Sequence, residues 1–505
     1  MEVKTTKTVK FLSIIFILLT IIHVLYATYS MRGLYLDDLF LMTKMLDNIS
    51  LGRFVICNDF DHPRYVMQFL QQAPVMFAGI VLKISSKKAL MMLHSLMCFG
   101  IPLIALYWNY KLTQRTKQWA ILFWSVVSYA AMILFAQIFP YVESFTGIVF
   151  QFVLLNYLFG KIHYTKRDKI GIFFLLIAMF GIYEYTIILG ILLFIGTFFT
   201  LFDEENPDDL QMKLVIGAGS LFASAYTIFF VILNKHEHSD GIRFFKEMFD
   251  FIPHTFDLNF GLFVITAVLL CLLIFKKGKL KLWQTFAIGL IYVAYLANMV
   301  TDLNTYLVPM WEIHMRSIPC WAMPAIFAGI VIYRYFKMPE QKELINRAYV
   351  PVLFCGIVLT CWQMVHTYYW NENINYIREK LDNCGAHIYV PAADEDLSSF
   401  FNEDLRRYIW ANGYPALSIL SNKKYKTKAF LFPPEETKSP ADETYLSHIW
   451  VSKERGIISI PIGMTLSIQN KFWDLSDCVD EMENYIESTG VETTKPENPD
   501  DIFYP

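Results

Sequence analysis

"FLSIIFILLTIIHVLYATY", residues 11–29, is an almost uninterrupted apolar run. About 20 apolar residues in a helix cross the roughly 30 Å hydrocarbon core of a bilayer. The composition agrees, because 55% of the 505 residues are hydrophobic and only 18% are charged. Three lysines precede the run, as in a signal peptide, but the run is too long for that and lacks a clean small-x-small cleavage site. We therefore predict a retained helix in a membrane protein.

Similar apolar runs recur as far as residue 366 and divide the chain into two parts. Residues 1–369 are predicted to form an all-α polytopic membrane domain with about eleven transmembrane helices. The expected spans are 11–29, 89–109, 119–138, 145–160, 169–186, 187–202, 213–233, 260–275, 282–300, 318–336 and 349–366. Residues 370–505 contain short strand-like segments and a closing amphipathic segment, which predict a small α+β domain. Its aromatics Trp410, Tyr414, Trp450 and Trp473 could stack on sugars, but core packing is the favoured interpretation.

Lysines and arginines gather in alternate loops between the expected spans. By the positive-inside rule these loops and the N-terminus are cytoplasmic, so the C-terminal domain is extracytoplasmic. The largest outer loop is then the first, residues 30–88. Its segment 68–84 is apolar enough for a short span, but a span there would place the later lysine clusters outside. We expect an interfacial or re-entrant helix instead.

Asp37 and Asp38 lie within about ten residues of the end of the first span, which places them near the membrane surface. Apolar residues then recur at helical spacing through residues 39–50, which predicts an amphipathic surface helix. Asp38 would be its N-cap. Two interpretations of this acidic pair are open. Either the pair serves capping alone, or Asp38 caps the helix while Asp37 acts as a general base or as a ligand of a divalent cation.

Glu143 is a second candidate acid, because the short turn 138–145 leaves it little room to reach bulk water. A simple interfacial glutamate is the equal alternative. Asp59, Asp61 and His62 could form a further acidic or metal cluster, but "NDFDHP" favours a turn.

Basic and aromatic residues of the outer loops could hold a lipid-linked sugar. Arginines bind phosphate well, and singly each could equally contact lipid headgroups. The candidates for donor phosphate are Arg32, Arg64, Arg243, His314 and Arg316, and those for sugar are Trp311 and Glu312.

Several function classes lack support in the sequence. The net charge of −3 and the lack of a basic block argue against nucleic acid. No Walker A loop, GxGxxG, GxSxG or HExxH motif occurs, and the eight cysteines show no metal-ligand spacing. An enzyme that acts on the outer face and has no nucleotide-binding motif would need a donor substrate that is linked to a lipid.

These features together resemble the GT-C superfamily of integral membrane glycosyltransferases. The "LYLDDLF" segment is similar to the acidic motif that follows the first helix in that superfamily, and segments 39–50 and 68–84 are similar to its surface helices. Glu143 corresponds to its second acid and residues 370–505 to its extracytoplasmic domain. The segments "DDLF…LGRF" and "GIYEYT" are similar to GtrII-like bacterial transferases that modify surface polysaccharide.

The resemblance implies inverting transfer of a sugar from a polyprenyl-phosphate donor to an acceptor outside: a saccharide, lipid or protein of the cell envelope. Asp37 would be the catalytic base or a ligand of Mg²⁺ or Mn²⁺, supported by Asp38 and Glu143, and arginines such as Arg64 or Arg316 would hold the phosphate. The DExR spacing of aminoarabinose transferases and the histidine-rich motifs of protein mannosyltransferases do not occur.

A transporter or flippase of lipid-linked saccharides is the alternative from another class. Such a protein would line its path with polar residues at mid-membrane depth. Only scattered candidates occur in the spans, namely Gln137, Gln151, Asn156 and Asn298. The sequence therefore favours the enzyme.

Overall fold

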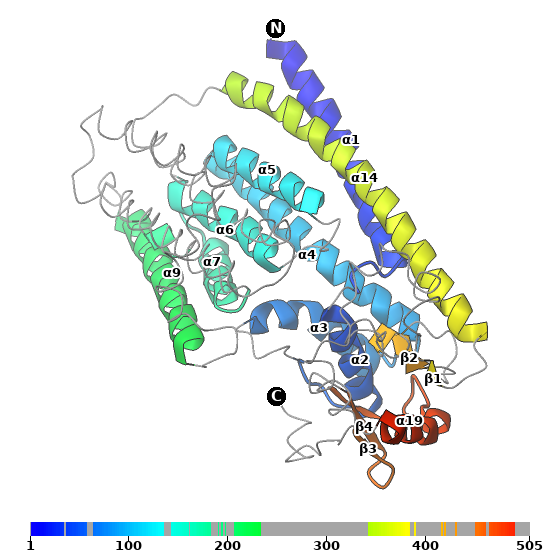
Figure 1. Ribbon diagram of the computed structural model, residues 1–505. Coiled ribbons are helices and arrows are strands. Elements are labelled where there is room, and N and C mark those ends of the chain that lie inside the picture. Colours follow the sequence, from blue (N-terminus) through cyan, green and yellow to red (C-terminus); the bar gives the residue numbers. More distant parts are fainter. Residues whose placement is uncertain are drawn as a thin grey trace, which may run out of the picture.

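The computed structural model of the chain is mostly helical (Figure 1). It describes residues 2–34, 37–57, 64–135, 143–160, 162–182, 207–233, 342–383, 388–389, 416–417, 419–420, 430–431, 450–460 and 464–489, with positions 190, 193–194 and 197. The helices are α1 (Glu2–Tyr29), α2 (Asp37–Ser50), α3 (Tyr65–Ile80), α4 (Lys87–Thr116), α5 (Trp119–Phe135), α6 (Glu143–Phe159), α7 (Lys166–Met179), α9 (Pro207–Leu233), α14 (Lys342–Asn383) and α19 (Ser476–Thr489). The strands are β1 (Ile388–Tyr389), β2 (Phe430–Leu431), β3 (Trp450–Ser452), β4 (Ile457–Ile460) and β5 (Met464–Ser467).

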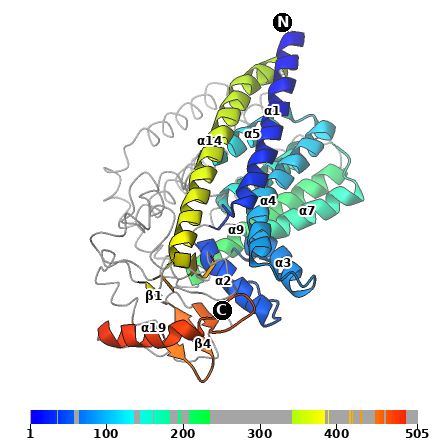
Figure 2. The same cartoon turned by 90° about the vertical axis from the view of Figure 1, so that its right-hand side faces the viewer.

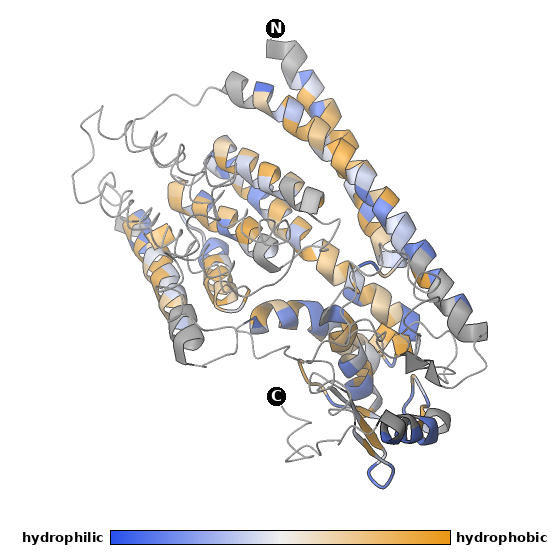
Figure 3. Ribbon diagram, viewed as in Figure 1, coloured by the Kyte–Doolittle hydropathy of each residue, from blue (hydrophilic) through white to orange (hydrophobic). Residues whose placement is uncertain are grey.

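Three described helices are long and apolar enough to cross a membrane: Thr6–Tyr29 in α1, Lys87–Thr116 in α4 and Arg347–Glu372 in α14. They contain the expected spans 11–29, 89–109 and 349–366. Large apolar side chains of α1 and α14 are exposed, as suits contact with lipid, for example Phe11 at 63% and Phe354 at 60% exposure. Hydrophobic residues follow much of both helices (Figure 3). The total of eleven stays a prediction, and the expected spans 260–275, 282–300 and 318–336 lie outside the described residues.

The directions of these three helices follow from their contacts. α1 and α14 run parallel, because Phe16 lies against Gly356 and the Trp370 indole donates to the Ser30 carbonyl, 3.2 Å away (Figures 1 and 2). α4 runs the opposite way, because its start contacts the end of α1.

Basic residues lie on one side of the bundle, near the starts of α1 (Lys7 and Lys10) and α14 (Arg347) and near the end of α4 (Lys111 and Arg115). α4 also begins with Lys87 and Lys88 at the opposite end, so the positive-inside rule is met clearly by α1 and not by α4 alone. The opposite end, where α1 ends and α4 begins, is the predicted outer side.

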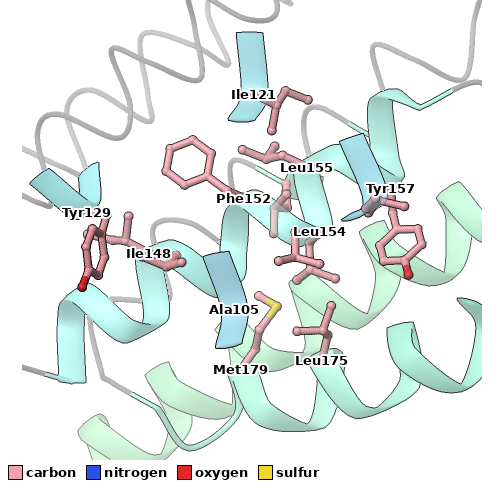
Figure 4. Packing of buried hydrophobic residues seen from close by; sticks show 14 of the residues in the cluster. Ala105, Ile121, Tyr129, Ile148, Phe152, Leu154, Leu155, Tyr157, Leu175 and Met179 are labelled. Atoms are coloured by element: carbon pink, nitrogen blue, oxygen red, sulfur yellow. The ribbon is translucent and has the colours of Figure 1, made fainter. Parts of the chain in front are cut away.

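The main apolar core joins α1 and α4 to α5, α6 and α7 (Figure 4). The α6 side chains Val149, Phe152, Leu154 and Leu155 have at most 1% exposure. Burying one such side chain contributes about 1.5–3 kcal/mol. Asn156 of α6 donates to Asn109 Oδ1 and Thr113 Oγ1 of α4, so buried polar side chains of the two helices are joined by hydrogen bonds.

α2 and α3 lie near the other end of the bundle, around the start of α4 (Figure 1). A helix over the predicted segment is confirmed, but its expected surface position is not, because its apolar residues from Leu39 to Ile49 are buried together with the polar Thr43 and Asp47 and no residue from Asp38 to Ser50 is exposed. α3 has 16 residues, fewer than the about 20 that cross a bilayer. Phe69 and Phe77 on its surface are about half exposed. These features favour the predicted interfacial helix over a full span.

The described C-terminal strands pack against α2. β3, β4 and β5 form an antiparallel sheet in that order, while β1 and β2 pair in parallel. Buried side chains of β4, β5 and the following turn share a second core with α2, α3 and the start of α4. Trp473 is 1% exposed and donates to the Ser467 carbonyl, which confirms core packing for this aromatic. The domain boundary expected after residue 369 falls inside α14, which continues to Asn383.

Candidate functional site

A tight turn after α1 brings the acidic motif against α4. The Gly33 amide donates to Ser95 Oγ at 3.0 Å, and a Cβ on Gly33 would lie only 2.8 Å from the Ser95 Cα. Real Cβ atoms essentially never come this close to backbone, so the turn requires glycine here. The neighbour of Ser95, His94, is thereby placed near the start of α2.

Asp38 and His94 form the central pair of the site. His94 Nε2 lies 3.0 Å from Asp38 Oδ1. His94 is fully buried, whereas the Asp38 side chain keeps 23% of its surface exposed. An ionised carboxylate only accepts hydrogen bonds, so Nε2 carries the proton that it donates to Asp38. The imidazole thus orients a carboxylate that solvent or a ligand can reach.

The N-cap prediction for Asp38 is wrong. α2 begins at Asp37, so Asp38 lies within the first helical turn. Its carboxylate is engaged by His94 across the fold, whereas an N-cap side chain would accept from the backbone of its own helix. The acid assigned to capping is therefore the one that the fold holds in a polar site.

Cys98 and Gln71 extend this site into the protein. Cys98 lies one helical turn after His94, with Sγ 3.7 Å from Nε2. Gln71 of α3 donates from Nε2 to Cys98 Sγ at 3.5 Å. The donor atoms of Asp38, His94 and Cys98 all lie within 4.8 Å of one another. Three chemically different ligands, from two helices, thus converge on one small volume.

Arg32 contacts α14 beside the site. Its side chain is 2% exposed, and its guanidinium carbon lies 5.1 Å from the ring centroid of Trp370. This cation–π contact joins the end of α1 to α14. The expected role of Arg32 in phosphate binding stays a prediction.

The loop that follows α2 is also firmly held. Gln72 accepts from the Cys57 amide at 2.8 Å and donates to the Cys57 carbonyl at 2.7 Å. Burial raises the pKa of the Cys57 thiol to about 11, so this cysteine is an inert thiol. The loop thus leaves α2 along a fixed path.

The remaining predicted site residues fall into three groups. Asp37 and Glu143 begin α2 and α6, but their side chains lie outside the described residues. Arg64 directly precedes α3 and is partly buried. Positions outside the described residues are Asp59, Asp61, His62, Arg243, Trp311, Glu312, His314 and Arg316.

The sequence reasoning missed His94, Cys98 and Gln71. The available signal was a histidine and a cysteine four positions apart inside an apolar span, since residues i and i+4 share one face of a helix. Gln71 belongs to the predicted interfacial segment 68–84, and the spacing of apolar residues in this segment did not indicate which of its faces is buried.

The cluster does not suit the expected Mg²⁺ or Mn²⁺. These ions prefer several oxygen ligands, while Asp38, His94 and Cys98 offer one oxygen, one nitrogen and one sulfur. Binding of such a cation by Asp37 stays a prediction.

No known family, curated protein or solved structure matches this chain.

Proposed function

We propose that the protein is an inverting glycosyltransferase that takes a sugar from a polyprenyl-phosphate donor and transfers it at the outer face of the membrane. The observation that carries the proposal is the Asp38 carboxylate, oriented by buried His94 and still partly exposed. It lies at the end of the candidate spans where α1 ends and α4 begins, which is the predicted outer side. A lipid-linked donor would present its phosphate and sugar at this level, with its tail in the bilayer.

The chemistry requires a base and a site for the leaving phosphate. An acceptor hydroxyl would lose its proton to a carboxylate of the Asp37–Asp38 pair while its oxygen forms the bond to the anomeric carbon. The bond from that carbon to the phosphate oxygen breaks with its electron pair, and polyprenyl phosphate leaves from the opposite face. This displacement inverts the anomeric configuration.

Two features of α3 support a lipid-phosphate substrate. Phe69 and Phe77 expose apolar surface beside the predicted membrane plane. Arg64 directly precedes α3, and the positive end of the α3 helix dipole also favours an anion. The expected phosphate ligands Arg243, His314 and Arg316, the sugar contacts Trp311 and Glu312, and the supporting acid Glu143 belong to the same proposal.

The decisive experiment compares Asp38→Asn with the wild type in nanodiscs. Release of polyprenyl phosphate from polyprenyl-phosphate glucose and mannose is measured with a mixed saccharide acceptor. Loss of a positioned base lowers the rate by about 10²–10⁴-fold. Asp480→Asn is the matched control, because this exposed acid in α19 pairs with Lys453. Full turnover in Asp38→Asn overturns the proposed role of this carboxylate.

The same preparation tests the transporter alternative. Wild-type protein that moves a fluorescent lipid-linked saccharide across vesicles, while releasing no polyprenyl phosphate, would replace the enzyme by a flippase. Asp37→Asn and Glu143→Gln, assayed beside Asp38→Asn, identify which acid of the proposed set is the base.

A further inference from the structure

We propose that Asp38, His94 and Cys98 bind a divalent transition-metal ion of the zinc type. The inference concerns the same site as the proposed transferase, but metal binding stands or falls independently of glycosyl transfer. It is distinct from the binding of Mg²⁺ or Mn²⁺ by Asp37 expected from the sequence, because its ligands are a nitrogen, a sulfur and an oxygen.

Two of the three distances between the ligand atoms agree with tetrahedral coordination, and the third, from Asp38 to Cys98 Sγ, is within 4.8 Å. Zinc bonds of about 2.0 Å to nitrogen or oxygen and 2.3 Å to sulfur place the ligand atoms about 3.3 Å (N···O) and 3.5 Å (N···S) apart. Here His94 Nε2 lies 3.0 Å from Asp38 Oδ1 and 3.7 Å from Cys98 Sγ. An ion between the three atoms needs side-chain shifts of only a few tenths of an ångström along these two edges.

The chemistry of the donors selects the ion. Imidazole and thiolate ligands suit zinc, cobalt and related ions better than magnesium or calcium. Binding would release the proton on His94 Nε2 and the thiol proton of Cys98, and would replace the hydrogen bond from His94 to Asp38. The metal would then be held by a histidine and a cysteine that lie buried in α4.

Gln71 provides a second, independent indication. Its amide donates toward Cys98 Sγ at 3.5 Å, and such a donor stabilises the negative charge of a metal-bound thiolate. The Gln71 side chain is itself buried, with 5% exposure, so its amide lies inside the protein. A buried amide directed at a buried sulfur fits an outer partner of a metal ligand.

The site keeps one side open. His94 and Cys98 are 0% and 2% exposed, whereas Asp38 is partly exposed. Three protein ligands with an accessible fourth position are typical of catalytic rather than structural zinc. An oxygen of the substrate or a water molecule would occupy the fourth position.

The test measures the metal directly. Protein purified without chelators is analysed for zinc by mass spectrometry, then stripped and titrated with Co²⁺, whose bond to sulfur gives a charge-transfer absorption band. We expect one ion per chain in the wild type, and loss of that band in Cys98→Ser. Cys57→Ser, which changes another buried cysteine, is the matched control and retains the band. Lack of zinc together with lack of a band in the wild type overturns the proposal, as does a band that persists in Cys98→Ser.

Gln71→Leu keeps the test decisive if Cys98→Ser fails to fold. Removal of an outer partner typically weakens metal affinity by about 10–100-fold while the ligands remain. We therefore expect the band to persist and to saturate at correspondingly higher Co²⁺, and unchanged affinity would contradict the site. Metal binding without transfer from any donor would refute the transferase alone, and transfer without metal would refute this inference alone.

Discussion

The contact between α2 and the C-terminal strands predicts that Asp47→Ala releases β5. Asp47 is 5% exposed and accepts from the Ser467 amide at 3.3 Å and from Asn470 Nδ2 at 2.9 Å. The alanine variant leaves both donors without this acceptor, at about 1–3 kcal/mol for each buried group. A total of about 2–6 kcal/mol raises the opening constant of β5 by roughly 30-fold or more, because about 1.4 kcal/mol is tenfold.

Asp47→Asn is the matched control. Burial raises the pKa of Asp47, because the hydrogen bonds to Asn470 and Ser467 only partly offset the loss of hydration. An asparagine keeps an acceptor oxygen and removes the charge whose burial is costly. The folded-state pKa is above the unfolded one, so the contribution of Asp47 is full at acid pH and is lost as the pH rises through the folded pKa. Wild type should therefore gain stability relative to Asp47→Asn as the pH falls.

Hydrogen exchange measured by mass spectrometry on protein in nanodiscs tests this reasoning. The amides of residues 464–468 should exchange about 30-fold faster or more in Asp47→Ala, and within about threefold of wild type in Asp47→Asn. Exchange of α6 amides, in the other core, should not change. Unchanged protection of β5 in Asp47→Ala, or equal acceleration by both variants, would refute the reasoning.

Three further substitutions have definite expected outcomes in thermal unfolding. Gly33→Ala places a Cβ against the α4 backbone and should lower the free energy of unfolding by about 1–3 kcal/mol. Its control is Gly100→Ala, in open space on α4, which should be neutral or stabilise by up to about 1 kcal/mol. Equal Tm values for the two variants would contradict this reasoning. Gln72→Leu removes two hydrogen bonds to the loop after α2 and should cost about 1–3 kcal/mol, with faster proteolysis of that loop; unchanged proteolysis would argue against it. Asp168→Asn disrupts the paired bonds with Arg115 and should lower Tm at pH 7. Despite burial, hydrogen bonds hold the pKa of Asp168 at about 2, so this difference should shrink as the pH falls from about 5 toward 2, and a constant difference would exclude the charge as its cause.

The helical framework could be predicted because hydrophobicity alone determines it. Apolar runs of sufficient length located α1, α4 and α14, and apolar residues at helical spacing located α2. The helix ends were less predictable. α14 extends from Lys342 to Asn383, well beyond its apolar part, because packing of Trp370 on the end of α1 continues the helix into polar sequence.

The site was only half predictable. The sequence marks Asp37 and Asp38 through their position after a span, but assigning the cap requires the start of the helix to within one residue. Helix starts are the least certain part of such reasoning. The partners His94 and Cys98 are separated from Asp38 by more than 50 residues, and they meet it only because Gly33 permits a close approach to α4.

α2 connects the site to the C-terminal strands. Asp38 and Asp47 are nine residues apart, which is about 13.5 Å along the helix and half a turn out of phase. One carboxylate therefore faces α4 and the other faces β5, with the buried stripe of α2 between them. Because the helix is short and held at both ends, loss of the contact at Asp47 should loosen the position of Asp38. We expect Asp47→Ala to lower both the protection of β5 from hydrogen exchange and the affinity for Co²⁺, and Asp47→Asn to change neither. That result would show that the C-terminal strands help to position the site. Unchanged Co²⁺ affinity in Asp47→Ala would show that the two ends of α2 are independent.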